Sequence, residues 1–175
     1  MKDFVTINTS ANISFLSILL FFVTSESYVK LLIRGKNLPR EKEEFLEKIF
    51  AEVVEKYVKF NVFSNDNVSQ TVKAFIDHLN ATYKVLLTTL GMGSLIIILG
   101  CPSLKSLELL WTDYRSGHLN KVAERYLVTD EVRKKLNLET ICLETAMITE
   151  ENYQNCKEAL MKLSSTCSGE YKQNI

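Results

Sequence analysis

The sequence predicts an α+β fold in which a four-stranded, mainly antiparallel sheet is packed with about six helices as an α-β sandwich. Three observations lead to this prediction. Two apolar runs, residues 83–90 and 95–101, flank a short loop with two glycines, which is the pattern of a β-hairpin. Apolar side chains recur at helical spacing over residues 45–57 and 104–114. Residues 140–145 alternate between apolar and polar side chains, as a half-buried strand does.

The composition bounds the class of protein. The 175 residues suffice for one domain, and 46% hydrophobic with 24% charged residues is ordinary for a globular chain. The 21 basic and 21 acidic side chains balance, whereas nucleic-acid-binding proteins normally carry a basic excess, so no nucleic-acid partner is expected. The four cysteines form no C-x-x-C pair and only two histidines exist, so no metal site and no cofactor are expected. Two disulfides or reduced thiols both remain open for Cys101, Cys142, Cys156 and Cys167.

Residues 1–27 form an apolar N-terminal segment with two interpretations. The run of residues 13–23 is too short to span a bilayer but has the length of a signal-peptide core, and residues 25–27 offer a cleavage site. The alternative is a strand or helix packed on the domain as an extension. Asn67 and Asn80 begin formal glycosylation sequons. If the segment is a packed extension, a cytoplasmic protein is expected; if it is a cleaved signal peptide, a secreted or lumenal protein is expected. A membrane partner is expected only if the segment is an anchor.

The first half of the domain reads as strand, helix, helix. Residues 28–34 form a predicted strand that ends at Gly35, and Pro39 suits the first turn of a helix. The next helix is expected to be capped by Asn65 or Asn67. His78 lies off the apolar stripe of that helix and is expected to be solvated. Both hairpin runs are nearly continuous in apolar residues, so they are expected to be central strands buried on both faces.

The second half reads as helices, a strand and a last helix. Ser103 is a predicted N-cap, and Gly117 is expected in the left-handed conformation that ends the helix. Trp111 and Tyr114 belong to the buried stripe, and Trp111 is expected to be largely buried between this helix and the sheet. Thr129 is a predicted cap of a short helix. The last helix is expected to continue through residue 163, before a polar tail of residues 164–175.

No pattern of catalytic residues accompanies these elements. Ser116 and His118 flank a glycine on a turn, without an orienting acid. The glycines of the hairpin precede a strand, whereas a phosphate-binding loop precedes a helix. Glu108 and Asp113 are spaced too far round a helix to act as a pair, and Cys101 is expected to be a buried structural thiol. The chain is therefore expected not to be an enzyme.

Three segments carry a family resemblance: residues 93–101, 107–120 and 122–130. Their most specific part is Leu-Trp-x-Asp-Tyr-x-Ser-Gly-His-Leu-Asn, which begins at Leu110. They resemble the TRADD-like N-terminal domain family, found in innate-immune and death-signalling proteins, and the likeness covers residues 28–163. It implies an α-β sandwich that acts by protein contact: a non-catalytic cytoplasmic adaptor in innate-immune, TNF-receptor or apoptosis signal transduction. The alternative is a secreted or lumenal protein of the same fold behind a cleavable signal peptide.

The resemblance also implies where a partner binds. In the family, the edge of the sheet and the hairpin engage a TRAF-type C-terminal domain, and the corresponding positions here are Tyr28, Thr89, Gly91 and Ile96. Thr88 and Met92 lie in the same hairpin and complete the predicted set. Met92 is apolar, sits at the loop tip between glycines, and is expected either to contact a partner or to fold back on the domain. No sequence pattern bears on the oligomeric state.

Overall fold

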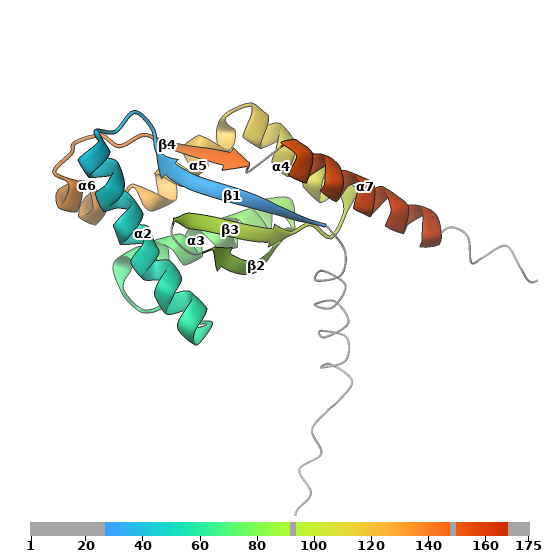
Figure 1. The fold of residues 1–175 in the computed structure, drawn as a ribbon, viewed down its shortest axis with the longest axis horizontal. Helices are drawn as coiled ribbons and strands as arrows, with labels where there is room; N and C mark the ends of the chain where they lie inside the picture. Colours follow the sequence, from blue (N-terminus) through green and yellow to red (C-terminus); the bar gives the residue numbers. More distant parts are fainter. Residues whose placement is uncertain (1–26, 92–93, 148–149, 168–175) are drawn as a thin grey trace, which may run out of the picture.

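The computed structural model describes residues 27–91, 94–147 and 150–167 (Figure 1). Its elements, in order, are β1 (Tyr28–Gly35), α2 (Arg40–Phe60), α3 (Asn67–Tyr83), β2 (Leu86–Gly91), β3 (Leu95–Gly100), α4 (Leu104–Arg115), α5 (His118–Leu127), α6 (Asp130–Leu136), β4 (Leu143–Met147) and α7 (Glu150–Cys167). Six helices and a four-stranded sheet in these ranges confirm the predicted α+β fold class.

The strands are ordered β2-β3-β1-β4, and every neighbouring pair is antiparallel. β1 pairs with β3 over residues 28–33 and with β4 over residues 31–35. The hairpin of β2 and β3 contains a register shift between Leu87 and Thr89, which is a β-bulge. The first hairpin run was expected to be a central strand, but β2 is an edge strand that begins only at Leu86, because Tyr83 is still the last residue of α3.

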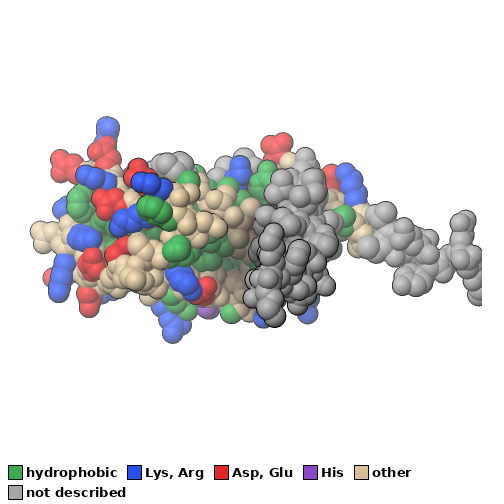
Figure 2. All heavy atoms as spheres, turned by 90° about the horizontal axis from the view of Figure 1, so that it is seen from below, with side chains coloured by type: hydrophobic (Ala, Val, Ile, Leu, Met, Phe, Trp, Pro, Cys, Tyr) green, Lys and Arg blue, Asp and Glu red, His purple; other side chains and the backbone are tan. Residues whose placement is uncertain are grey.

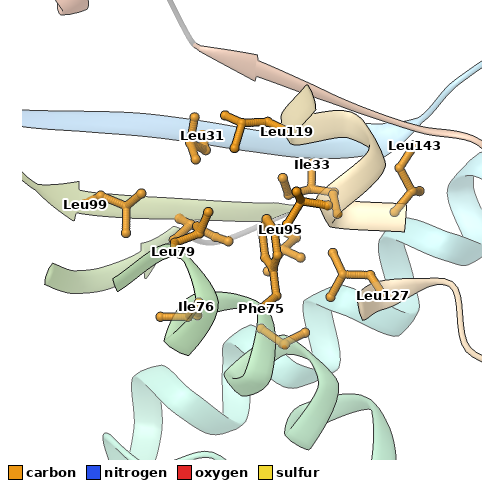
Figure 3. Close-up of a cluster of buried hydrophobic side chains, with 14 of the residues drawn as sticks. Leu31, Ile33, Phe75, Ile76, Leu79, Leu95, Leu99, Leu119, Leu127 and Leu143 are labelled. Carbon is orange, nitrogen blue, oxygen red and sulfur yellow. The ribbon is translucent and has the colours of Figure 1, made fainter. Parts of the chain in front are cut away.

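Only one face of the sheet is buried, which corrects the expectation of two-sided burial. Along β1 and β3 the burial alternates residue by residue. The inner face carries Val29, Leu31, Ile33, Leu95, Ile97 and Leu99. These residues belong to one hydrophobic core to which α2 through α7 all contribute buried side chains. Figure 3 shows Phe75 and Leu79 of α3 and Leu119 and Leu127 of α5 gathered around these strands.

Side chains at the helix ends account for where several helices begin. The hydroxyl of Ser103 accepts from the backbone N–H of Ser106 (3.1 Å), and Thr129 accepts from Val132 (3.3 Å), so both predicted N-caps are confirmed. The predicted cap of α3 was wrong: Asp66, and neither neighbouring asparagine, accepts from the backbone N–H of Ser69 at 2.9 Å. All three residues are capping types, and the sequence pattern could not separate adjacent candidates.

Gly117, Trp111 and Tyr114 were predicted to be structural residues. Gly117 follows the end of α4, and Trp111 lies where α4 contacts α7. Gly117 has φ 76°, the left-handed conformation that was predicted. Trp111 is half-buried rather than largely buried against the sheet, and its ring stacks on Tyr153 of α7 at 4.0 Å between centroids and 12° between planes. Tyr114, the third residue, is half-buried with its ring 5.3 Å from that of Trp111. The aromatic stripe of α4 therefore serves a helix–helix contact.

β4 is anchored on both sides. One edge pairs with β1, and on the other edge the backbone N–H groups of Leu143 and Thr145 donate to Glu124 (2.9 Å) and Asn120 (2.8 Å) of α5. β4 begins at Leu143, three residues after the predicted start. Beyond the reach of β4, the Asn152 side chain of α7 accepts from the backbone N–H of Lys30 and donates to the carbonyl of Tyr28 in β1, both at 3.2 Å.

Two further expectations concern His78 and the C-terminal end. His78 is half-buried rather than solvated, because its Nδ1 lies 3.2 Å from the hydroxyl of Tyr126 and the two rings are 5.2 Å apart. α7 continues to Cys167, beyond the predicted end at residue 163, and residues 168–175 lie outside the described part of the chain. None of the helices formed by the described residues is long and apolar enough to cross a membrane.

Candidate binding surface on the open face of the sheet

The strand pairing brings twelve residues onto the face of the sheet that is not buried. Directly paired residues of antiparallel strands carry their side chains on the same face. The register aligns Leu32 with Ile96 and Ala146, and Lys30 with Ile98. We call this surface the outer face; it comprises Tyr28, Lys30, Leu32, Arg34, Leu86, Thr89, Gly91, Ile96, Ile98, Gly100, Glu144 and Ala146.

The outer face has an apolar centre and a charged rim. Leu32, Ile96 and Ile98 form the centre and are each half-buried. At one end the guanidinium of Arg34 pairs with the carboxylate of Glu144. At the other end the ammonium of Lys30 lies 5.8 Å from the ring centroid of Tyr28. An apolar centre inside a polar rim is the anatomy of a protein–protein interface.

Gly91 shapes the edge of this surface beside Ile96, its partner across the hairpin. A Cβ atom at position 91 would lie 2.8 Å from the Cβ and 3.1 Å from the Cγ2 of Ile96. Only a glycine therefore leaves room for the isoleucine to lie over the edge strand. This contact keeps the apolar centre continuous as far as β2.

The structure brings together four of the six residues predicted to bind a partner. Tyr28, Thr89, Gly91 and Ile96 all lie on the outer face, on three different strands. Thr88 is exposed at the β-bulge, where the alternation of side chains is interrupted. Met92 lies outside the described residues.

Sequence reasoning missed Lys30, Leu32 and Ile98 as members of the surface. The expectation of two-sided burial assigned the apolar residues of β1 and β3 to the core. A signal was available in β1, where Lys30 and Arg34 are four residues apart and so lie on the same side of a strand. Two cations on one side of a strand indicate that this side is not fully buried.

Figure 2 shows the molecule turned by 90° about its long axis. Acidic and basic side chains are intermixed at the end where α2 and α6 lie, while apolar side chains and uncharged surface occupy the middle. On this side the charged groups alternate in sign rather than gather into one electrostatic patch.

A hollow of about 570 Å³ lies between the loop after β1, the start of α5 and the start of β4. It is lined by Ser116, Asn120 and Glu124 among others. The two α5 side chains hold β4, and the hydroxyl of Ser116 donates to the carbonyl of Asp113 at 3.1 Å while accepting from the N–H of His118 at 3.3 Å. These three polar side chains thus serve local structure, and no described histidine lines the hollow.

The described thiols differ in environment. Cys101, at the end of β3, is fully buried as predicted, and a hydrogen bond with Cys156 together with burial raises its pKa well above the usual value. Its thiol is therefore protonated and a poor nucleophile. Cys142 is exposed. Among residues 27–91, 94–147 and 150–167, no three His, Cys, Asp or Glu side chains are grouped closely enough to hold a metal ion.

The two carboxylates considered as a pair in the sequence are separated in the structure. Asp113 accepts from the hydroxyl of Tyr83 at 2.7 Å, whereas Glu108 pairs with Lys157 of α7 at 2.8 Å. Burial and then the neighbouring Asp113 raise the pKa of Tyr83, so its hydroxyl stays a donor.

Comparison with known proteins found no match: no protein-family model, no curated protein and no solved structure resembles the chain significantly.

Proposed function

We propose that this chain is a non-catalytic interaction domain that binds another protein through the outer face. The observation that carries the proposal is the apolar centre of Leu32, Ile96 and Ile98, whose side chains are half-buried and lie between charged groups at either end of the outer face. Soluble domains rarely leave such a patch unused. The four predicted partner-binding residues that lie on this same face add support.

The class of partner follows from the resemblance given above, and it remains part of the proposal. The TRADD-like frame implies an adaptor in innate-immune, TNF-receptor or death-type signalling, and a TRAF-type C-terminal domain is the first partner to test. The outer face is compatible with such a protein partner because its centre offers apolar contact and its rim offers Lys30, Arg34 and Glu144 for orientation.

We place the protein in the cytoplasm, and two hydrogen bonds favour that over the secreted alternative. The Nδ2 atom of Asn80 donates to the carbonyl of Val85 at 2.8 Å, and that of Asn67 donates to Glu131 at 2.8 Å. A glycan would attach to these same nitrogen atoms and disturb both contacts. Intact mass measurement of the protein from animal cells tests this: a sugar on either asparagine, or loss of residues 1–27, would establish the secreted form.

Substitution in the apolar centre tests the binding surface. We expect Ile98→Glu to weaken binding to purified TRAF-type C-terminal domains about thirtyfold, because a lost interface hot spot costs about 2 kcal/mol or more. Thr89→Lys, at the edge of the same face, should weaken binding less. Leu109→Glu is the matched control, because Leu109 is 44% exposed on α4 and lies off the sheet.

The readout is a titration followed by calorimetry, with thermal unfolding of each variant to confirm folding. If the wild-type chain binds and Ile98→Glu binds equally well, the outer face is not the interface. If no member of a panel of TRAF-type domains binds the wild-type chain, the partner class is wrong.

A further inference from the structure

We propose that residues 13–23 of the same chain cover the outer face when no partner is bound, and that a partner must displace them. The first half of this inference concerns the chain alone. The second half, displacement by a partner, rests on the function proposed above. The segment lies outside the described residues, and the argument comes from the surface, the sequence and the point where the chain enters the sheet.

The composition of the central strands calls for a second cover. Residues 95–99 are all aliphatic, a pattern typical of strands that are buried on both faces. The helices α2 to α7 all contribute buried side chains to the core, whereas Ile96 and Ile98 on the outer face are only half-buried, together with Leu32. The sheet thus has an apolar side that the described helices leave uncovered.

The N-terminal segment has the complementary composition. No charged residue occurs from residue 4 to residue 25, and nine of the eleven residues from 13 to 23 are apolar. A segment of this composition is driven out of water by the hydrophobic effect. The outer face needs a neutral apolar cover, because its centre is uncharged and Arg34 is already paired with Glu144.

The chain enters the sheet at the border of this face. The carbonyl of Ser27 accepts from the N–H of Cys101 at 2.9 Å, and the next residue, Tyr28, lies on the outer face opposite Gly100. Three residues, 24–26, separate this anchor from the apolar run and reach roughly 10 Å when extended. Neighbouring strands lie about 5 Å apart, and four strands span about 14 Å. The run can therefore reach Ile98 and Leu32.

The tether favours this occupant over a second copy of the chain. A segment joined by three residues competes at an effective concentration in the millimolar range. A second copy would have to be present at a comparable concentration to replace it. The same tether makes the cover displaceable, because a partner of high affinity removes it without unfolding the domain.

Photo-crosslinking in the full chain tests the cover without any partner. A p-benzoylphenylalanine at Thr89, on the outer face, should cross-link to residues 13–23 within one chain, as read by peptide mass spectrometry of the monomer band. The same group at Lys30 is a second probe should the first site perturb the edge strand. The control places it at Leu109 of α4, where cross-links to this segment should be at least fivefold weaker.

Charge in the segment should uncover the face. We expect Leu19→Glu to lower the cross-link yield at Thr89 severalfold, whereas Asn8→Glu, which adds the same charge outside the apolar run, should leave it unchanged. Cross-links that join two chains only, or a yield equal to the Leu109 control, would overturn the inference, as would removal of the segment in animal cells. If a TRAF-type partner binds, Leu19→Glu should raise its affinity about threefold or more; loss of partner binding alone leaves the cross-link result intact.

Discussion

Gly117 joins α4 to α5 through a backbone conformation that most residues avoid. Its φ of 76° is left-handed, and a Cβ atom there would meet nothing closer than the Asn120 amide nitrogen at 3.9 Å. The constraint is therefore conformational and not steric. The glycine made this left-handed conformation predictable from the sequence. Asn61, Lys84 and Asn137 also have positive φ at the ends of helices, but these residue types occur in many conformations and so gave no comparable signal.

We expect Gly117→Ala to lower the free energy of unfolding by about 1 kcal/mol, because an alanine Cβ disfavours positive φ. Gly117→Asn should cost less, since this chain itself places asparagine at positive φ at positions 37, 61 and 137. Urea unfolding of the three proteins measures the differences. Equal stability of the alanine variant and the wild type would show that the turn relaxes to another conformation.

Asp66 is the residue whose ionisation contributes most visibly to the fold. Burial disfavours its charge, but hydrogen bonds from Ser64, Ser69 and Lys56 outweigh burial and hold the pKa of the carboxyl well below its usual value. Two of these contacts measure 2.5 Å, to the Ser64 hydroxyl, and 2.9 Å, to the Ser69 backbone N–H. The carboxylate thereby fixes the start of α3 and ties it to α2 through Lys56.

The stability that Asp66 provides should depend on pH. Its folded-state pKa lies below the unfolded value of about 3.9, so its contribution is complete above that value and is lost as the pH falls. Asp66→Asn keeps a good N-cap and removes the charge. We expect the variant to be less stable than the wild type at pH 6 by about 1 kcal/mol or less, because the side chain is 40% exposed, and we expect this difference to shrink steadily as the pH falls below about 4. A difference that does not shrink with falling pH would assign the effect to the cap alone.

At the scale of elements, an aromatic stack joins α4 to α7. Trp111 and Tyr153 stack, Arg115 lies 5.8 Å from the centroid of the tryptophan ring, and Glu108 pairs with Lys157 across the same interface. The sequence predicted both helices from their apolar spacing but assigned Trp111 to the sheet. Periodicity shows which side of a helix is buried, but it does not show which element buries it.

A double-mutant cycle measures this stack. We expect Trp111→Leu and Tyr153→Leu each to destabilise the domain, and the pair to be coupled by about 0.5–1.5 kcal/mol, the usual worth of an aromatic pair. Arg40→Met provides a control, because its ion pair with Glu44 is exposed on α2 and exposed ion pairs contribute little. Strictly additive effects of the two leucine substitutions would mean that the rings only fill space.

At the scale of the molecule, the sequence predicted the fold class, the hairpin and most helices, since these follow from local spacing and caps. It could not predict which strand lies at the edge, because β2 and β3 are both rich in aliphatic residues and strand order depends on distant pairing. It also could not assemble the outer face, whose members come from all four strands. The four predicted partner-binding residues that lie on the outer face were proposed from family resemblance and not from periodicity.

The bonds that α5 and α7 make to the sheet have a consequence for self-association. Unpaired strand edges are templates for pairing with another chain, and proteins protect them. Here Glu124 and Asn120 occupy the outer edge of β4, and Asn152 occupies the part of β1 that β4 does not reach. Within the described residues, β2 is the edge without such side-chain protection from a neighbouring helix, although its bulge interrupts the hydrogen-bonding row and the Thr89 hydroxyl donates to the carbonyl of Leu90 at 3.4 Å. Polymerisation by strand addition would therefore begin at β2, and it would proceed from the hairpin side of the molecule rather than from β4.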